Sequence, residues 1–192
     1  MELFNELMYQ IRACKVCESF LPLGANPVVQ AHPESKIVLI GQAPGLKVHE
    51  SNIAWNDASG DQLRKWLHVT KEQFYDPKLF ALIPMGFCYP GKGSSGDLPP
   101  RKECAPLWHK KLLDEMHQVE LILLIGQYSQ RYYLKDKKHE NTTENVRHFK
   151  EYLPKYFPLP HPSPRNFIWM NKNDWFITDV LPELKNRVTA IL

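Results

Sequence analysis

The sequence contains no long uncharged apolar run, no internal repeat and no low-complexity tract. A transmembrane helix needs about 20 mainly apolar residues in succession, so we expect no contact with a membrane. The first residues, MELFNELMYQIRAC, include Glu2 and Glu6 and lack the basic start and apolar middle of a secretory signal. These absences predict a soluble protein located in the cytoplasm.

The sequence also lacks a strong excess of charge, since its 192 residues carry a formal net charge of +3 and its pI is about 8.6. This balance permits an anionic partner such as nucleic acid without requiring one. Apolar residues make up 43% and charged residues 23% of the chain, as in globular proteins. We therefore expect one domain over residues 1–192, and a monomer.

Cysteine is scarce, and its four positions form two groups. Cys14 and Cys17 make a Cys-x-x-Cys at the end of an expected helix, while Cys88 follows an expected strand and Cys104 opens a helix beyond a long loop. Cytoplasmic proteins rarely keep structural disulfides, so metal binding, redox chemistry or simple packing has to explain this spacing. Four thiolates can hold an iron–sulfur cluster or a zinc ion, and four independent buried thiols are the alternative.

Short apolar runs alternate with amphipathic segments along the chain. Buried strands are predicted at residues 36–40, 79–84 and 120–125, with a further strand near 158–160. Helices are predicted at 3–13, 61–69, 104–118, 142–156 and from 173 onward, with a break at Pro182, and a further short helix is predicted to open at Gly126. This alternation predicts a three-layer α/β/α fold whose central sheet is mainly parallel and has about four strands. Ligands of such sheets bind beyond the carboxyl ends of the strands.

Two loops at expected strand ends carry distinctive residues. Residues 41–45 read Gly-Gln-Ala-Pro-Gly, and residues 161–166 read His-Pro-Ser-Pro-Arg-Asn. Glycine permits close approach of a ligand to the backbone, and proline fixes the loop that presents His161. We refer to them as the first loop and the histidine loop, and we expect them to meet.

Together the two loops resemble those of the uracil-DNA glycosylase superfamily. The cysteine spacing is similar to that of the iron–sulfur family four, in which the first loop reads Gly-Glu-Ala-Pro-Gly, whereas Gln42 replaces the glutamate here. The histidine loop looks more like that of the single-strand-selective and other families. The resemblance implies removal of uracil or a related deaminated base from DNA, with a 4Fe-4S cluster as cofactor and damaged DNA as partner.

The resemblance also implies roles for individual residues. His161 would donate a hydrogen bond to the departing base, and Trp55 would stack on it. Gln42, Ala43 and Gly45 would line the base or hold the attacking water. Ser163 would grip phosphates, and Arg165 and Asn166 would reach the groove or fill the gap left by the extruded base. The implied cluster ligands are Cys14, Cys17, Cys88 and Cys104.

Two positions depart from the family pattern. Ala43 stands where some families have a water-activating carboxylate, for which His49, Asp57 and Asp61 are nearby candidates. Pro84 stands where family four has an asparagine that reads the base, and proline offers no donor. Base recognition has then passed to the backbone of Met85 and Gly86, or it is relaxed or lost.

These departures leave other functions open. The main alternative is a non-catalytic nucleic-acid-binding relative of the same fold, and a more distant one is a zinc-stabilised hydrolase of free nucleotides. The basic stretch at residues 135–139 is expected to be a solvated loop, with contact to DNA phosphates as the alternative.

Overall fold

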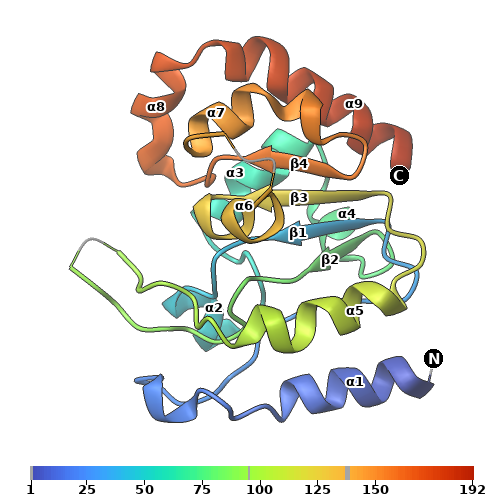
Figure 1. Cartoon of the computed structure of the whole chain (residues 1–192), viewed down its shortest axis with the longest axis vertical. Helices are drawn as coiled ribbons and strands as arrows, with labels where there is room; N and C mark the ends of the chain where they lie inside the picture. The colour runs from blue at the N-terminus through green and yellow to red at the C-terminus, as the bar shows by residue number, and fades with distance from the viewer. Residues whose placement is uncertain (1, 95, 137–138) are drawn as a thin grey trace.

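The computed structural model describes residues 2–94, 96–136 and 139–192. Its centre is a four-stranded sheet in the order β2-β1-β3-β4, in which every neighbouring pair is parallel (Figure 1). The strands are β1 (Ile37–Ile40), β2 (Phe80–Leu82), β3 (Leu121–Ile125) and β4 (Tyr156–Leu159). The predicted three-layer α/β/α fold with about four strands is confirmed.

Both faces of the sheet are covered, which explains why its strands are apolar at almost every position. Val38, Ile40 and Leu124 belong to a core shared with α1 (Glu2–Arg12) and α5 (Lys110–Glu115). Ile37, Leu39 and Leu123 belong to a second core shared with α3 (Ala58–Leu67) and α9 (Leu181–Ile191). Figure 1 shows α1 and α5 on one side of the sheet and α9 on the other.

Shorter helical segments connect these elements. The remaining α-helices are α2 (Leu46–Ser51), α4 (Lys71–Tyr75), α6 (Gln127–Tyr133), α7 (Thr142–Arg147) and α8 (Phe167–Lys172). Two π-helical turns, Ala105–His109 and Phe176–Val180, precede α5 and α9. Three 3₁₀ turns span Glu18–Phe20, Phe149–Tyr152 and Pro164–Asn166. The sequence did not predict α2, α4 or α8.

The predicted helix at residues 142–156 is wrong in its second half. The α-helix ends at Arg147, a 3₁₀ turn follows, and Tyr156 begins β4, where it pairs with Ile122. Leu153 is extended (φ −72°, ψ 155°), as expected for a residue that precedes a proline. The predicted break at Pro182 falls where the π-helical turn Phe176–Val180 gives way to α9, and Pro182 lies in the first turn of α9, where the missing N–H is tolerated.

The loops that follow β1, β2 and β4 leave the sheet at the same edge, as the parallel pairing requires (Figure 1). Within the described part of the chain, no helix has the length and apolar character needed to cross a membrane.

Candidate functional site

The first loop and the histidine loop meet at one cavity of about 180 Å³. A cavity of about 150 Å³ is enough to hold a benzene ring, so this space suits a single six-membered ring. Beside the two loops, its wall includes Trp55, Asp57, Pro84 and Asp97. The expectation that two segments far apart in the sequence converge is thus met in the structure.

Backbone hydrogen bonds fix the first loop against the segment after β2. Met85 N donates to Gly41 O (2.9 Å), and Gly86 N donates to Gln42 O (3.0 Å). Met85 and Gly86 do not line the cavity, while Gln42, Ala43 and Gly45 do. The amides expected to read the base are therefore engaged in positioning the loop, and the base-binding role of Met85 and Gly86 stays a prediction.

Trp55 is held in the cavity wall by two close backbone approaches. A β-carbon on Gly41 would lie 2.8 Å from Trp55 Cζ2, and one on Gly60 would lie 1.8 Å from the Trp55 carbonyl oxygen. Trp55 itself has a left-handed backbone (φ 57°), which is uncommon for a large residue. Its indole lies 6.0 Å from the His161 ring, with 32° between the ring planes. The two side chains expected to contact a base therefore stand side by side.

His161 follows β4 and is partly buried in the cavity wall. Burial lowers the pKa of His161, and the negative charge of Asp57 opposes this shift. The imidazole is therefore neutral near pH 7 and can donate one N–H. Asn166 Nδ2 donates to the His161 carbonyl oxygen at 2.5 Å, which closes the loop behind the ring.

The other residues predicted to contact DNA lie in the short turn after His161. Ser163 Oγ accepts from Arg165 N (3.3 Å), and Arg165 is exposed. The Asn166 amide is occupied by the His161 carbonyl. Next to them, Phe167 and Ile168 are 63% and 67% exposed, an unusual position for apolar side chains that sequence reasoning missed. The contacts of Ser163, Arg165 and Asn166 with DNA stay predictions.

Asp97 is the main cavity residue that sequence reasoning missed. It lies in the long breaker-rich loop, which folds back on itself: Leu98 N donates to Gly91 O (2.8 Å), and Lys92 and Asp97 form an antiparallel bridge. We call the described residues 91–94 and 96–98 the hairpin. Gly91 and Gly96 have positive φ angles, and such a glycine pair was the available sequence signal for a turned-back segment.

His109, a buried histidine that sequence reasoning did not single out, contacts the part of the cavity wall formed by Pro84. His109 Nε2 lies 3.0 Å from Pro84 O, and its Nδ1 lies 2.7 Å from the Tyr133 hydroxyl. Burial lowers the pKa of His109 to about 4, so the ring is neutral. Because the Pro84 carbonyl can only accept, Nε2 carries the proton and Nδ1 accepts from Tyr133. These two hydrogen bonds hold the carbonyl group of Pro84, a residue of the cavity wall, in place.

The four cysteines line a second, small hollow between α1 and the segment after β2. Cys14, Cys17, Cys88 and Cys104 all face it, together with Trp108 and Arg101. Burial raises the pKa of Cys88 to about 11 and that of Cys104 to about 12, so without a metal these thiols are protonated. The Nε1 atom of Trp108 is buried without a hydrogen-bond partner among the described residues.

The described cysteine sulfur atoms are not arranged as a preformed tetrahedral zinc site. No three of the four described cysteine sulfurs lie within 4.8 Å of one another. Tetrahedral zinc with bonds of about 2.3 Å would require sulfurs about 3.8 Å apart.

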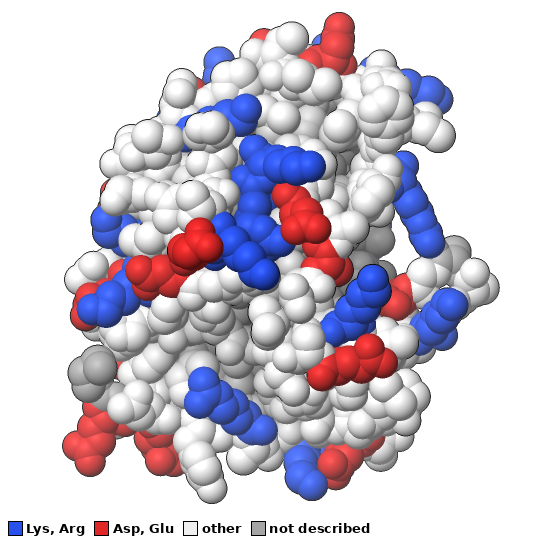
Figure 2. All heavy atoms as spheres, turned by 180° about the vertical axis from the view of Figure 1, so that it is seen from behind, with Lys and Arg blue, Asp and Glu red and all other residues white. Residues whose placement is uncertain are grey.

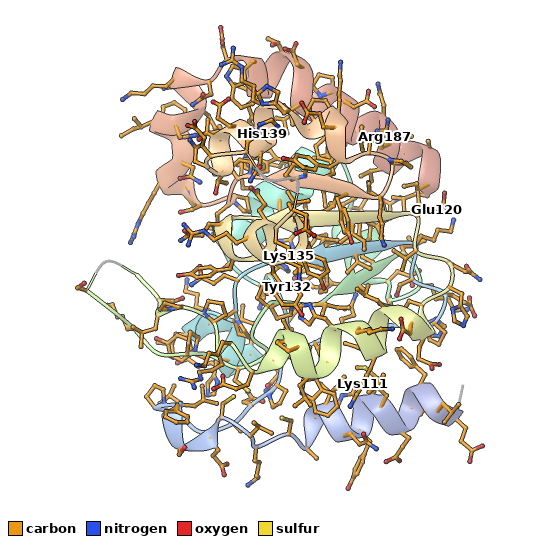
Figure 3. The ribbon with its side chains drawn as sticks, viewed as in Figure 1. Lys111, Glu120, Tyr132, Lys135, His139 and Arg187 are labelled. Atoms are coloured by element: carbon orange, nitrogen blue, oxygen red, sulfur yellow. The ribbon has the colours of Figure 1, made fainter. Side chains whose placement is uncertain are left out.

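In the basic stretch at residues 135–139, the described residues Lys135, Asp136 and His139 line neither the cavity nor the hollow. Lys135 is exposed, as expected for a solvated loop, while Lys137 and Lys138 lie outside the described residues. His139 (labelled in Figure 3) is joined to Glu151 at 3.0 Å and stacks on His148 at a ring distance of 4.2 Å. The contact of this stretch with DNA phosphates stays a prediction.

Surface charge does not locate a partner by itself. On the face opposite to the view of Figure 1, basic and acidic side chains are interspersed (Figure 2). The small net charge of +3 agrees with this mixture. The assignment of function therefore depends on the cavity and its residues.

The model of one protein family, described as the uracil DNA glycosylase superfamily, matches residues 29–185. The matched span includes the first loop, Trp55, the hairpin and the histidine loop. Cys88 and Cys104 also fall within it, whereas Cys14 and Cys17 precede it.

Proposed function

This chain belongs to the uracil-DNA glycosylase superfamily, whose members act on DNA, and we propose that it hydrolyses the N-glycosidic bond of uracil or a related deaminated base in DNA. One observation carries the proposal: the first loop, Trp55 and His161 surround a single cavity with room for one base. A base inside a duplex is out of reach, so the nucleotide has to be extruded into this cavity.

In the proposed reaction the base leaves with the electron pair of the broken bond. Trp55 stacks on the extruded ring, and the neutral imidazole of His161 donates a hydrogen bond to the pyrimidine oxygen on which negative charge develops. One such donor contributes roughly 3 kcal/mol to transition-state stabilisation. The lowered pKa of His161 supports this role, because a neutral ring donates without first requiring a proton from solvent.

Gln42, Ala43 and Gly45 form the wall nearest the first strand. Gln42 Nε2 already donates to Leu98 O (3.0 Å), which supports a role in holding the hairpin over the cavity beside its proposed contact with base or water. Ala43 has no group that polarises water, so a side chain from another segment has to do so.

We propose that Cys14, Cys17, Cys88 and Cys104 hold a 4Fe-4S cluster. Two features support it: the hollow that the four cysteines share, and a buried Trp108 N–H that has no acceptor among the described residues. Sulfide and thiolate sulfurs can accept such a hydrogen bond. When bound, the cluster would cross-link the end of α1 to the segments that flank the hairpin.

The partner in this proposal is DNA that contains a damaged base, bound by a monomer in the cytoplasm, with residues 1–192 acting as one domain. Ser163 and Arg165 would contact the backbone of the DNA. The exposed Phe167 and Ile168 support a DNA-facing role for this edge, because apolar side chains can occupy the space that an extruded base leaves.

A second candidate is a DNA-binding relative without catalytic activity. Two observations favour it: Ala43 and Pro84 both line the cavity, where some families have a water-activating carboxylate and family four has an asparagine that reads the base. Such a protein would bind damaged DNA with a strong dependence on salt and leave the glycosidic bond intact.

A substrate panel tests the proposal. Single- and double-stranded oligonucleotides containing uracil, hypoxanthine or xanthine are incubated with the protein, and abasic sites are detected by alkaline cleavage. We expect product from at least one substrate and a loss of about 100-fold in His161→Ala. His117→Ala, at an exposed position, serves as the matched control. Salt-sensitive binding without any abasic product would support the second candidate instead.

A further inference from the structure

We propose that Asp97 is the catalytic carboxylate that holds and deprotonates the attacking water. This inference rests on the proposed glycosylase function and names a residue for the step that Ala43 cannot perform. The cavity wall contains two carboxylates, Asp57 and Asp97. Their hydrogen bonds and the segments that carry them separate their roles.

The hairpin brings Asp97 to the cavity from a segment far from the first loop. Its two arms are joined by Leu98 N to Gly91 O (2.8 Å), by Gly93 N to Gly96 O (2.6 Å) and by the bridge between Lys92 and Asp97. This pairing sets the orientation of Asp97 relative to the sheet edge.

The hairpin is also attached to the first loop. Gln42 Nε2 donates to Leu98 O (3.0 Å), one residue beyond Asp97. A β-carbon on Gly45 would lie 3.4 Å from Asp97 Oδ2, so the carboxylate stands directly against the first loop. Glycine at position 45 leaves room there, and Asp97 lines the same cavity as Ala43, where a carboxylate of the loop itself is missing.

The side chain of Asp57 has a structural hydrogen bond that the side chain of Asp97 lacks. Asp57 Oδ1 accepts from Gly60 N (2.8 Å) and caps α3. Within the described residues, the Asp97 side chain makes no hydrogen bond. Its two oxygens are therefore available to a water molecule, while the charge of Lys92 lies on the same hairpin.

The electrostatic environment agrees with a basic role. Loss of solvent raises the pKa of Asp97, Lys92 opposes this shift, and Asp57 adds to it. A carboxylate with a raised pKa is a stronger base than an ordinary one.

The proposed step consumes one water molecule and releases the free base. The water oxygen forms a bond to C1′ of the deoxyribose, and the proton it loses passes to the Asp97 carboxylate. The bond from C1′ to the base nitrogen breaks, and its electron pair leaves with the base, whose oxygen is hydrogen-bonded by His161. The base takes a proton from solvent as it departs, and Asp97 returns its proton to solvent.

The test separates turnover from binding. We expect Asp97→Asn to lower the single-turnover rate on the best substrate by at least about 100-fold. Its Kd for an oligonucleotide with a non-cleavable 2′-fluoro-2′-deoxyuridine should stay within about threefold of wild type, because the amide keeps the shape of the side chain. Asp114→Asn, which removes a surface carboxylate paired with Lys110, is the matched control and should change neither quantity.

Chemical rescue gives an independent readout. Formate should restore part of the rate of Asp97→Ala and leave Asp114→Asn unaffected, because a small carboxylate can occupy the vacated space. An Asp97→Asn protein that turns over at the wild-type rate, while His161→Ala does not, would overturn the inference and leave the glycosylase function standing. Absence of product from the wild-type protein on every substrate would overturn both.

Discussion

Gly60 lies in the first turn of α3, directly beneath the carbonyl group of Trp55. Its Cα has no room for a side chain, because the carbonyl oxygen stands 1.8 Å from the position of a β-carbon. Trp55 has a left-handed backbone at this approach, and the Gly60 amide donates to the side chain of Asp57 (2.8 Å). The absence of a side chain at Gly60 thus allows Trp55 to take its position in the cavity wall.

We expect Gly60→Ala to lower the free energy of unfolding by about 2–4 kcal/mol, because the backbone of Trp55 has to move to admit the methyl group. Urea unfolding followed by circular dichroism measures this loss. Lys65→Ala, on the exposed side of the same helix, is the control and should change stability by less than about 0.5 kcal/mol. Equal unfolding free energies of the Gly60→Ala and Lys65→Ala proteins would contradict the close approach between Gly60 and the Trp55 carbonyl group.

His109 makes the stability of the protein sensitive to acid. The pKa of His109 is lowered to about 4 in the folded state by burial, whereas an unfolded histidine titrates near 6.5. The unfolded chain therefore binds a proton first, so this contribution is fully present above pH 6.5 and is lost as the pH falls toward 4.

The stability lost through His109 over this range is about 3 kcal/mol. We therefore expect the difference in unfolding free energy between wild type and His109→Gln to shrink by that amount from pH 7 to pH 4. Urea unfolding at several pH values measures it, with the exposed His117→Gln as control. A difference that does not change with pH would mean that His109 is not a buried neutral ring.

At the scale of the element, Asp57, which lines the cavity, is also the N-cap of α3. We expect Asp57→Ala to lower the free energy of unfolding by about 1 kcal/mol, because the Gly60 amide loses its acceptor. Asp57→Asn retains an oxygen acceptor and should cost less than half as much. Thermal unfolding of the two variants measures the difference, and equal losses would show that the cap does not matter.

The elements also show how far local pattern predicts structure. The buried strands predicted at 36–40, 79–84 and 120–125 agree with the structure to within a few residues, because both faces of the sheet are covered and every residue of β1, β2 and β3 is apolar. The segment at 142–156 was misjudged because helical periodicity continues through Phe149 and Tyr152, which pack in 3₁₀ geometry. At Tyr156 the chain is extended and pairs with β3, although the sequence pattern there favours a helix.

At the scale of the whole molecule, the four cysteines connect segments that are distant in the sequence. Cys14 and Cys17 follow α1, Cys88 follows β2, and Cys104 precedes the π-helical turn. Because the four thiols lie around one small hollow, a centre bound there would join the first helix to the segments on both sides of the hairpin.

We expect purified protein to contain about four iron atoms per chain and to absorb in the visible blue, because four thiolates are the ligands of such a cluster. Cys88→Ser should lower the iron content, reduce the melting temperature by several degrees and increase hydrogen exchange in residues 13–25. Trp108→Phe should keep the iron but shift the reduction potential, because it removes the unpaired N–H. Zinc in place of iron would contradict the cluster, and unchanged melting of Cys88→Ser would contradict its structural role.

The sequence by itself determined the parallel α/β architecture, the family, and the candidacy of Trp55, His161 and the four cysteines. These follow from local signals: apolar runs define buried strands, and short motifs mark the loops at their ends. Parallel pairing then brings such loops to one edge of the sheet.

Only the tertiary structure decided which groups remain available for chemistry. It engages the amides of Met85 and Gly86 with the first loop and the amide of Asn166 with the His161 carbonyl. It also brings Asp97 into the cavity on a hairpin whose position depends on Gln42. The reason is physical: loop groups choose their hydrogen-bond partners among segments distant in the sequence, and no periodicity or propensity along the chain encodes that choice.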